Sequence, residues 1–261
     1  MSLPAPDLMT SVAAVYRIAW TRLVRGRKLL LGAGATLLIV VASVATRYLA
    51  TDTSAEDAVE GGVSVGFFGM LAYLLPFLCA SGAISEEVES RTFPYLAMRP
   101  TGRFALTLGK WLAAASMASL VLGIGVILLH VAAWATEPSE MIEGMPGTLR
   151  IVGSLVLLTF CYSAICLFWG ALVVEAAGVM AALHLAFLEF AVGSLPGAFR
   201  FGSMNYLASQ LAGLPKGGFR PDWVPDIETW ICGVVVAVVM VVFLGLAALV
   251  VESSEFGYGR A

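Results

Sequence analysis

The chain has 261 residues, of which 59% are hydrophobic and only 13% are charged. A soluble domain of this length carries about a quarter charged residues, so the composition excludes an ordinary soluble enzyme and indicates a protein solvated by lipid. The formal net charge of −3 gives no basis for nucleic-acid binding.

The apolar residues are gathered into six runs, each long enough to cross a bilayer as a helix. They predict spans at about 29–48, 63–84, 107–135, 151–174, 177–195 and 230–251. The runs lack the alternation that is typical of transmembrane strands, and no soluble domain separates them. We therefore expect an all-α membrane protein in which residues 1–261 form one transmembrane domain.

The distribution of lysine and arginine predicts the orientation of these spans. With the N-terminus in the cytoplasm, ten of the fifteen basic residues lie on the cytoplasmic side. We therefore expect a multi-pass protein with both termini in the cytoplasm. This orientation also places residues 84–110 on the cytoplasmic face.

Residues 8–28, ahead of the first span, show helical periodicity with an apolar and a basic side. An amphipathic helix of this kind lies among the lipid headgroups. The residues expected to place it there are Tyr16, Arg17, Trp20 and Arg25. The alternative is an ordinary basic flank that only fixes the orientation of the first span.

No pattern in the chain predicts catalysis or metal binding. The four cysteines all fall inside apolar runs without a CxxC pair, so neither a disulfide framework nor a zinc site is indicated. The nucleotide-binding motif GxxxxGK[ST] and the zinc-protease motif HExxH are absent. We expect no catalytic residue, no metal and no cofactor in this chain, which moves, holds or senses something rather than transforming it.

Glu189 lies inside the apolar run 177–195. A carboxylate at membrane depth is expected to face the protein interior or to find a partner, so Glu189, together with His184, is a candidate for a transport path or gate. The simpler alternative, which we favour, is that Glu189 reaches the outer interface near Pro196. The stretch 196–229 then predicts a long outer loop that folds back on the membrane surface.

Residues 84–110 are the densest polar stretch between two long apolar runs. Three glutamates come first, Pro100 to Gly102 predict a turn, and the next apolar run follows. We expect a short cytoplasmic helix, a bend and a re-entry, forming a compact and exposed element. The alternative is a solvated loop with no partner.

The order of these residues resembles the signature loop of ABC type-2 transporter permeases. That loop runs from acidic residues to threonine, then to a proline with basic residues, and ends in an apolar-Gly-Lys sequence. The corresponding residues are Glu86, Glu87, Glu89, Ser90, Arg91 and Thr92, then Arg99, Pro100 and Arg103, then Leu108, Gly109 and Lys110. Arg91 stands where the family often has glycine. The six-span layout and the basic helix before the first span are also similar.

The resemblance implies the membrane-spanning permease subunit of an ATP-binding cassette exporter, acting as a homodimer in the bacterial inner membrane. A separate cytoplasmic ATPase would bind ATP and Mg and dock on a coupling helix between spans two and three. An accessory extracytoplasmic protein is a further candidate partner. Carried over by position, the docking residues are Glu86, Glu87, Glu89, Ser90, Arg91, Thr92, Arg99 and Arg103.

Two other classes of function stay open. One is a stand-alone secondary transporter driven by an ion gradient through Glu189 and His184, and the other is a membrane scaffold or sensor. Because Glu86 and Glu87 are expected to lie in water, reversing both to lysine is predicted to uncouple the ATPase without unfolding the spans.

Overall fold

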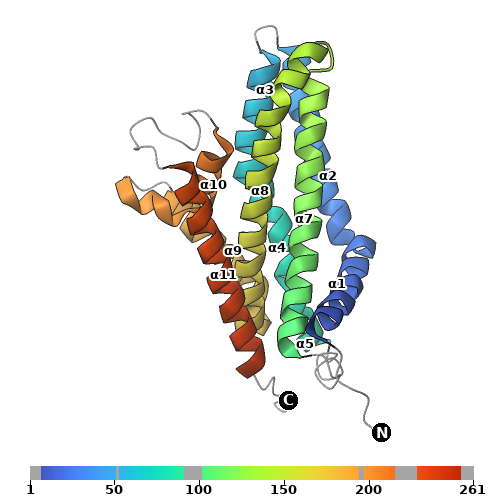
Figure 1. The fold of residues 1–261 in the computed structure, drawn as a ribbon. Coiled ribbons are helices and arrows are strands. Elements are labelled where there is room, and N and C mark those ends of the chain that lie inside the picture. The colour runs from blue at the N-terminus through green and yellow to red at the C-terminus, as the bar shows by residue number, and fades with distance from the viewer. Residues whose placement is uncertain (1–6, 51–52, 91–101, 194–196, 215–227, 254–261) are drawn as a thin grey trace.

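The computed structural model describes residues 7–50, 53–90, 102–193, 197–214 and 228–253, and every regular element in these ranges is a helix. The elements are α1 (Leu8–Arg25), α2 (Arg27–Leu49), α3 (Ala55–Gly61), η1 (Gly62–Leu71), α4 (Ala72–Ala80), α5 (Gly82–Glu89), α7 (Arg103–Ala133), α8 (Pro138–Leu172), η2 (Val174–Ala176), α9 (Ala177–Leu185), η3 (Ala186–Val192), η4 (Gly197–Gly202), α10 (Met204–Ala212) and α11 (Thr229–Ser253). Figure 1 shows them as one elongated bundle.

Five helical stretches in the described ranges are long and apolar enough to cross a membrane. They are Arg27–Leu49, Ala55–Glu89, Arg103–Ala133, Pro138–Leu172 and Thr229–Ser253. The second joins α3, η1, α4 and α5 end to end. These stretches agree with five of the six predicted spans and support the prediction of a helical membrane protein.

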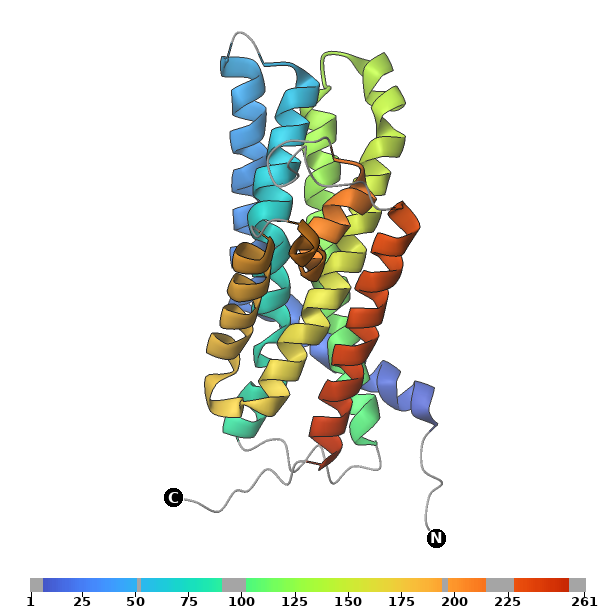
Figure 2. The ribbon, with the colours of Figure 1, turned by 90° about the vertical axis from the view of Figure 1, so that its left-hand side faces the viewer.

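The predicted span at 177–195 is the exception. Its residues form α9, an α-helix of only nine residues, which continues into the π-helical turns of η3 as far as Val192. In Figure 2 this segment rises only part of the way along the bundle. A sixth full-length span is therefore not confirmed.

The fourth span extends further than its apolar run. We expected it to begin at residue 151, but α8 begins at Pro138 and has 35 residues. Proline is tolerated in the first turn of a helix, where its missing N–H has no intrahelical partner. The polar start of α8 is thus helical although hydropathy alone predicts a loop.

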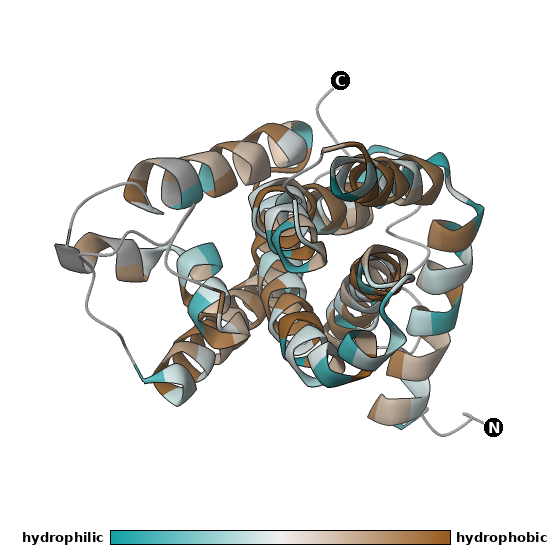
Figure 3. Cartoon of the chain, turned by 90° about the horizontal axis from the view of Figure 1, so that it is seen from above, coloured by the Kyte–Doolittle hydropathy of each residue, from teal (hydrophilic) through white to brown (hydrophobic). Residues whose placement is uncertain are grey.

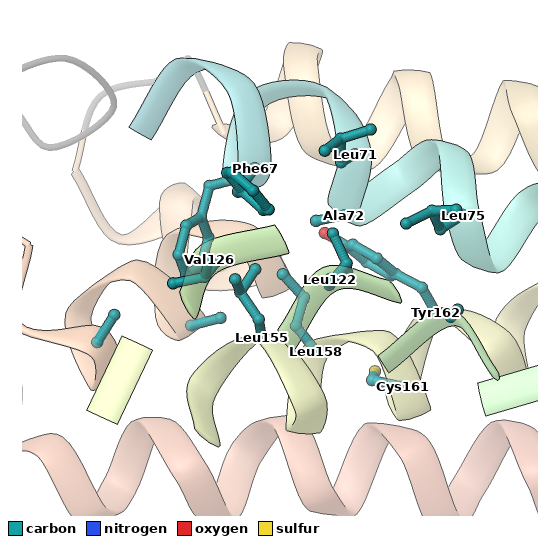
Figure 4. Packing of buried hydrophobic residues seen from close by; sticks show 14 of the residues in the cluster. Phe67, Leu71, Ala72, Leu75, Leu122, Val126, Leu155, Leu158, Cys161 and Tyr162 are labelled. Carbon is teal, nitrogen blue, oxygen red and sulfur yellow. The ribbon is translucent and has the colours of Figure 1, made fainter. Parts of the chain in front are cut away.

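Helix α8 lies at the centre of the bundle and contacts α7, α11, α4 and α10. Figure 4 shows the packing between η1, α4, α7 and α8. The large side chains that fill this core are almost completely buried. They include Phe67, Leu71, Leu75, Leu122, Leu155, Leu158 and Tyr162. All four cysteines are buried as well, as expected from their positions inside apolar runs.

The outer surface of the bundle is also apolar. On α2 the side chains of Leu30, Leu31, Leu37 and Leu38 are each more than half exposed. In the view down the bundle, hydrophobic colouring extends to outward-facing parts of several helices (Figure 3). A helix that is hydrophobic on all sides is typical of a membrane span, which agrees with the composition.

The stretch predicted as a long outer loop contains ordered helix. Ser203 caps the N-terminus of α10 by accepting a hydrogen bond from the Tyr206 N–H, and Gly213 ends it in the left-handed conformation with φ of 74°. Residues of α10 are buried against α8 and α11. The prediction of a loop lying on the membrane surface is therefore wrong for 204–212, because this segment packs onto the bundle.

Candidate functional site

The two ends of the predicted coupling segment lie at one end of the bundle. Helix α5 ends there and α7 begins there, close to α1 and to the end of α11 (Figure 1). Residues 91–101 between them lie outside the described residues, and with them the candidate docking residues Arg91, Thr92 and Arg99. The other candidate docking residues are placed by α5 and α7.

Glu86 on α5 forms ion pairs with α1 and α2. Its Oε2 lies 3.2 Å from the Arg22 guanidinium, and its Oε1 pairs with the Lys28 ammonium. Arg22 is in the last turn of α1 and Lys28 in the first turn of α2. Glu86 therefore ties the junction between these two helices to the end of the second span.

Glu87, the next residue, pairs with α7. Its Oε2 contacts the Lys110 ammonium, and its Oε1 lies 3.6 Å from Arg22. Lys110 also donates to the Ala83 carbonyl oxygen at 2.6 Å. The side chains of Lys110 and Glu87 are only 5% and 12% exposed. We name Arg22, Lys28, Glu86, Glu87 and Lys110 the charged cluster.

The charged cluster corrects the expectation that the whole segment 84–110 is exposed. Helix α1 packs along α7, and Lys110 of α7 bonds to Glu87 and to the Ala83 carbonyl oxygen of α5, so the Glu87 and Lys110 side chains are largely enclosed by protein. A buried charge needs a partner of opposite sign and hydrogen bonds, and this pair supplies both. Glu86 and Glu87 therefore form ion pairs with other helices of the same chain, which the sequence analysis did not predict.

Gly109 explains why α1 comes so close to α7. A Cβ atom at this position would lie 2.8 Å from the Val15 side chain and 3.0 Å from the Val12 carbonyl oxygen. Only glycine fits there without moving α1. The adjacent Gly109 and Lys110 of the apolar-Gly-Lys sequence therefore have separate structural roles, one in helix contact and one in the charged cluster.

Arg103, another candidate docking residue, contacts the last helix. Its guanidinium donates to the carbonyl oxygens of Glu252 at 2.9 Å and Val251 at 3.4 Å. A cation at a helix C-terminus satisfies carbonyl groups that have no intrahelical partner. By contrast, Glu89 and Ser90 are exposed at the end of α5.

The four residues predicted to place the N-terminal helix at the interface all lie on α1. Tyr16 and Trp20 stack with ring centroids 5.7 Å apart, and the Tyr16 hydroxyl lies 3.4 Å from the Ser116 hydroxyl of α7. Arg17 and Arg25 are exposed. One side of α1 therefore faces the bundle and its basic side is open.

Glu189 lies in η3 and is bonded to the start of α10. Its carboxylate accepts hydrogen bonds from the Ser203 hydroxyl, from the Met204 N–H at 3.1 Å and from the Asn205 N–H at 3.2 Å. The N-terminus of a helix favours a negative charge because its first N–H groups lack intrahelical partners. Glu189 is only 8% exposed, so it is enclosed by protein instead of reaching an interface.

His184, the second candidate for a path or gate, has different neighbours. Its ring lies 5.8 Å from the Trp169 ring and 5.4 Å from the Phe243 ring. The structure therefore does not bring His184 and Glu189 into one described cluster. Ser203 and Gly213, which cap α10, were the signals in the sequence from which this partner of Glu189 could have been found.

Replacing Glu189 with glutamine is expected to loosen α10. The amide keeps one acceptor oxygen, but its NH2 group faces a donor, so at least one buried hydrogen bond is lost. We expect the free energy of unfolding to fall by about 1–2 kcal/mol, measured by thermal unfolding of the purified chain in detergent. Glu140→Gln, at an exposed position of α8, is the control, and an equal effect of both variants would contradict this role for Glu189.

The chain was also compared with known proteins. No model of a protein family matches it, and no curated protein matches it.

Proposed function

We propose that this chain is the membrane-spanning permease subunit of an ATP-binding cassette exporter. It forms the translocation path as a homodimer in the bacterial inner membrane, and a separate cytoplasmic subunit binds ATP and Mg and hydrolyses the nucleotide. The segment between α5 and α7 is the coupling element on which this ATPase docks. An accessory protein outside the cytoplasm is a further candidate partner.

The observation that carries the proposal is the order of residues 86–110 together with their attachment to two spans. Helix α5 is the continuation of the helical stretch Ala55–Glu89, and α7 is a helix of 31 residues. A partner that pushes on the segment between them pushes on both spans. Rigid elements joined in this way transmit the closure of one subunit to another.

The charged cluster adds a physical reason for such coupling. It fastens α5 to α1, α2 and α7, so that a force on the end of α5 reaches three other helices. In this account α9 and η3 form a sixth, shorter span. Helix α1 lies in the headgroup region of the inner leaflet, and both termini are cytoplasmic.

Affinity purification of the tagged chain in mild detergent tests the proposal. Mass spectrometry is expected to find a stoichiometric cytoplasmic ATPase with the purified chain. A chain that purifies without an ATPase in several detergents would overturn the proposal. A carrier driven by an ion gradient, or a scaffold, would then account better for the sequence.

Glu89→Lys is the sharper variant for docking, because Glu89 is exposed at the end of α5 and makes no ion pair with any described residue. We expect it to reduce the amount of co-purified ATPase several-fold while the thermal stability of the chain stays unchanged. Glu140→Lys makes the same charge change at the opposite end of the bundle and is expected to leave the co-purified amount unchanged. Equal ATPase recovery with both variants would remove Glu89 from the docking surface.

A further inference from the structure

A cavity of about 360 Å³ lies between α1, the start of α2, α5 and α7. Its walls are mainly apolar. They are formed by Val15, Ile18, Ala19, Leu23, Cys79 and Leu106. Its size and apolar lining are typical of a site for a small molecule or for part of a lipid.

The lining of this cavity also carries charge. Arg22, Arg27, Lys28 and Lys110 line the cavity together with only two carboxylates, those of Glu86 and Glu87. The cavity lining therefore has two more positive than negative charges. An anionic group with an apolar extension matches both parts of this lining.

Arg27 lines the cavity but is not part of the charged cluster. Arg22, Lys28 and Lys110 each pair with Glu86 or Glu87, whereas Arg27 forms no ion pair with any carboxylate of the described residues. Its side chain is exposed at the junction of α1 and α2. A phosphate beside Arg27 would be the natural partner of this guanidinium, because guanidinium and phosphate form paired, charge-assisted hydrogen bonds.

We infer that this cavity binds an anionic phospholipid. The phosphate headgroup lies at Arg27 and the charged cluster, and the first part of an acyl chain lies against Val15, Ala19 and Leu106. Basic residues beside a membrane span attract anionic lipids, and the apolar walls distinguish this site from a site for a free anion. The bound lipid fills the space beneath α1 and contacts both α1 and α5.

The inference does not rest on the proposed function, because every residue that lines the cavity is in this chain and no ATPase is needed to form it. It gives the protein a dependence on lipid composition at the place where α1 and α5 meet. A membrane poor in anionic lipid would leave Arg27 without its partner and reduce the contacts that fix α1 against α5.

Native mass spectrometry of the purified, delipidated full chain in detergent tests the site. Phosphatidylglycerol and phosphatidylcholine vesicle lipids of the same chain length are added in turn, and inorganic phosphate is added as a competitor. We expect one tightly held phosphatidylglycerol per chain, at least fivefold weaker retention of phosphatidylcholine, and no displacement by millimolar phosphate. Equal retention of the two lipids, or full displacement by phosphate alone, would overturn the inference.

Two variants and one control sharpen the result. Arg27→Gln is expected to weaken phosphatidylglycerol retention about fivefold, the effect of one basic residue near a lipid surface. Ala19→Phe, which fills the cavity without changing its charge, is expected to abolish the tightly held lipid. Arg25→Gln removes a charge only two residues from Arg27, at the end of α1 and outside the cavity lining, and it is expected to leave retention unchanged. Equal losses with Arg25→Gln and Arg27→Gln would show general surface attraction and contradict the site.

Discussion

Replacing Lys110 with methionine is expected to lower the free energy of unfolding by about 3–5 kcal/mol, the usual effect of leaving one member of a buried ion pair without its partner. Methionine keeps the length and apolar stem of lysine but removes the ammonium. That group binds the Glu87 carboxylate and the Ala83 carbonyl oxygen. Glu87 then loses its ion pair with Lys110 and keeps the longer contact to Arg22. Thermal or chemical unfolding of the purified chain in detergent measures the loss.

The second member of the pair supplies the control. In the double variant Lys110→Met/Glu87→Leu both charges of the pair are replaced by apolar side chains, so most of the stability is expected to return. A double-mutant cycle separates this coupling from the effect of each single change. If the double variant loses as much stability as the two single variants added together, a direct interaction between Lys110 and Glu87 is contradicted.

Replacing Gly109 with alanine is expected to push α1 away from α7. The new methyl group would lie 2.8 Å from Val15 and 3.0 Å from the Val12 carbonyl oxygen, and a backbone atom cannot turn aside as a side chain does. Overpacking of this kind costs about 1–3 kcal/mol. The expected result is a lower unfolding temperature together with faster proteolysis of α1.

Gly34 is the matched control for this substitution. It lies inside α2, and a Cβ atom there would have no neighbour within 4 Å. Alanine has the higher helix propensity, so Gly34→Ala is expected to be neutral or to stabilise the chain by up to about 1 kcal/mol. If Gly109→Ala is also neutral or stabilising, the close contact between α1 and α7 does not require glycine at position 109.

Hydropathy located five of the six predicted spans, because a membrane-spanning helix is apolar along its length. The run at 177–195 instead forms a nine-residue α-helix followed by π-helical turns, so the predicted number of spans is not confirmed. Side chains on the outside of a span are apolar as well as those in its core. On α2 the exposed side chains include Leu30, Leu31, Leu37 and Leu38. An unbroken apolar run in the sequence therefore marks the helix that it forms. The same method failed at the start of α8, where polar residues after Pro138 are helical. Hydropathy detects lipid contact but does not detect a helix that continues beyond the apolar run.

Side-chain partners were much less predictable than spans. Charge alone indicated that Glu86 and Glu87 lie in water, because the sequence does not show that α1 comes back against α5 and α7. Likewise, Glu189 and its partner Ser203 are fourteen residues apart and meet only because α10 packs onto the bundle. Long-range contacts of this kind depend on how helices are arranged, which periodicity along one helix does not reveal.

The charged cluster also changes the expected result of reversing Glu86 and Glu87. A lysine at position 87 would face Lys110 in a region that is almost closed to solvent. This reversal is therefore expected to destabilise the chain in addition to altering any docking surface. Loss of ATPase binding in that double variant would therefore have two explanations. The Glu89→Lys variant separates these two explanations, because Glu89 is exposed.

Site-specific photocrosslinking at position 89 tests the central proposal most directly. A photoreactive amino acid is placed at Glu89 in one variant and at Glu140, on the opposite end of the bundle, in a second, and both are irradiated in intact cells. The permease account predicts a covalent adduct between position 89 and a cytoplasmic ATP-binding subunit, and none from position 140. An adduct from both positions, or from neither while the chain is fully produced in the membrane, would contradict it.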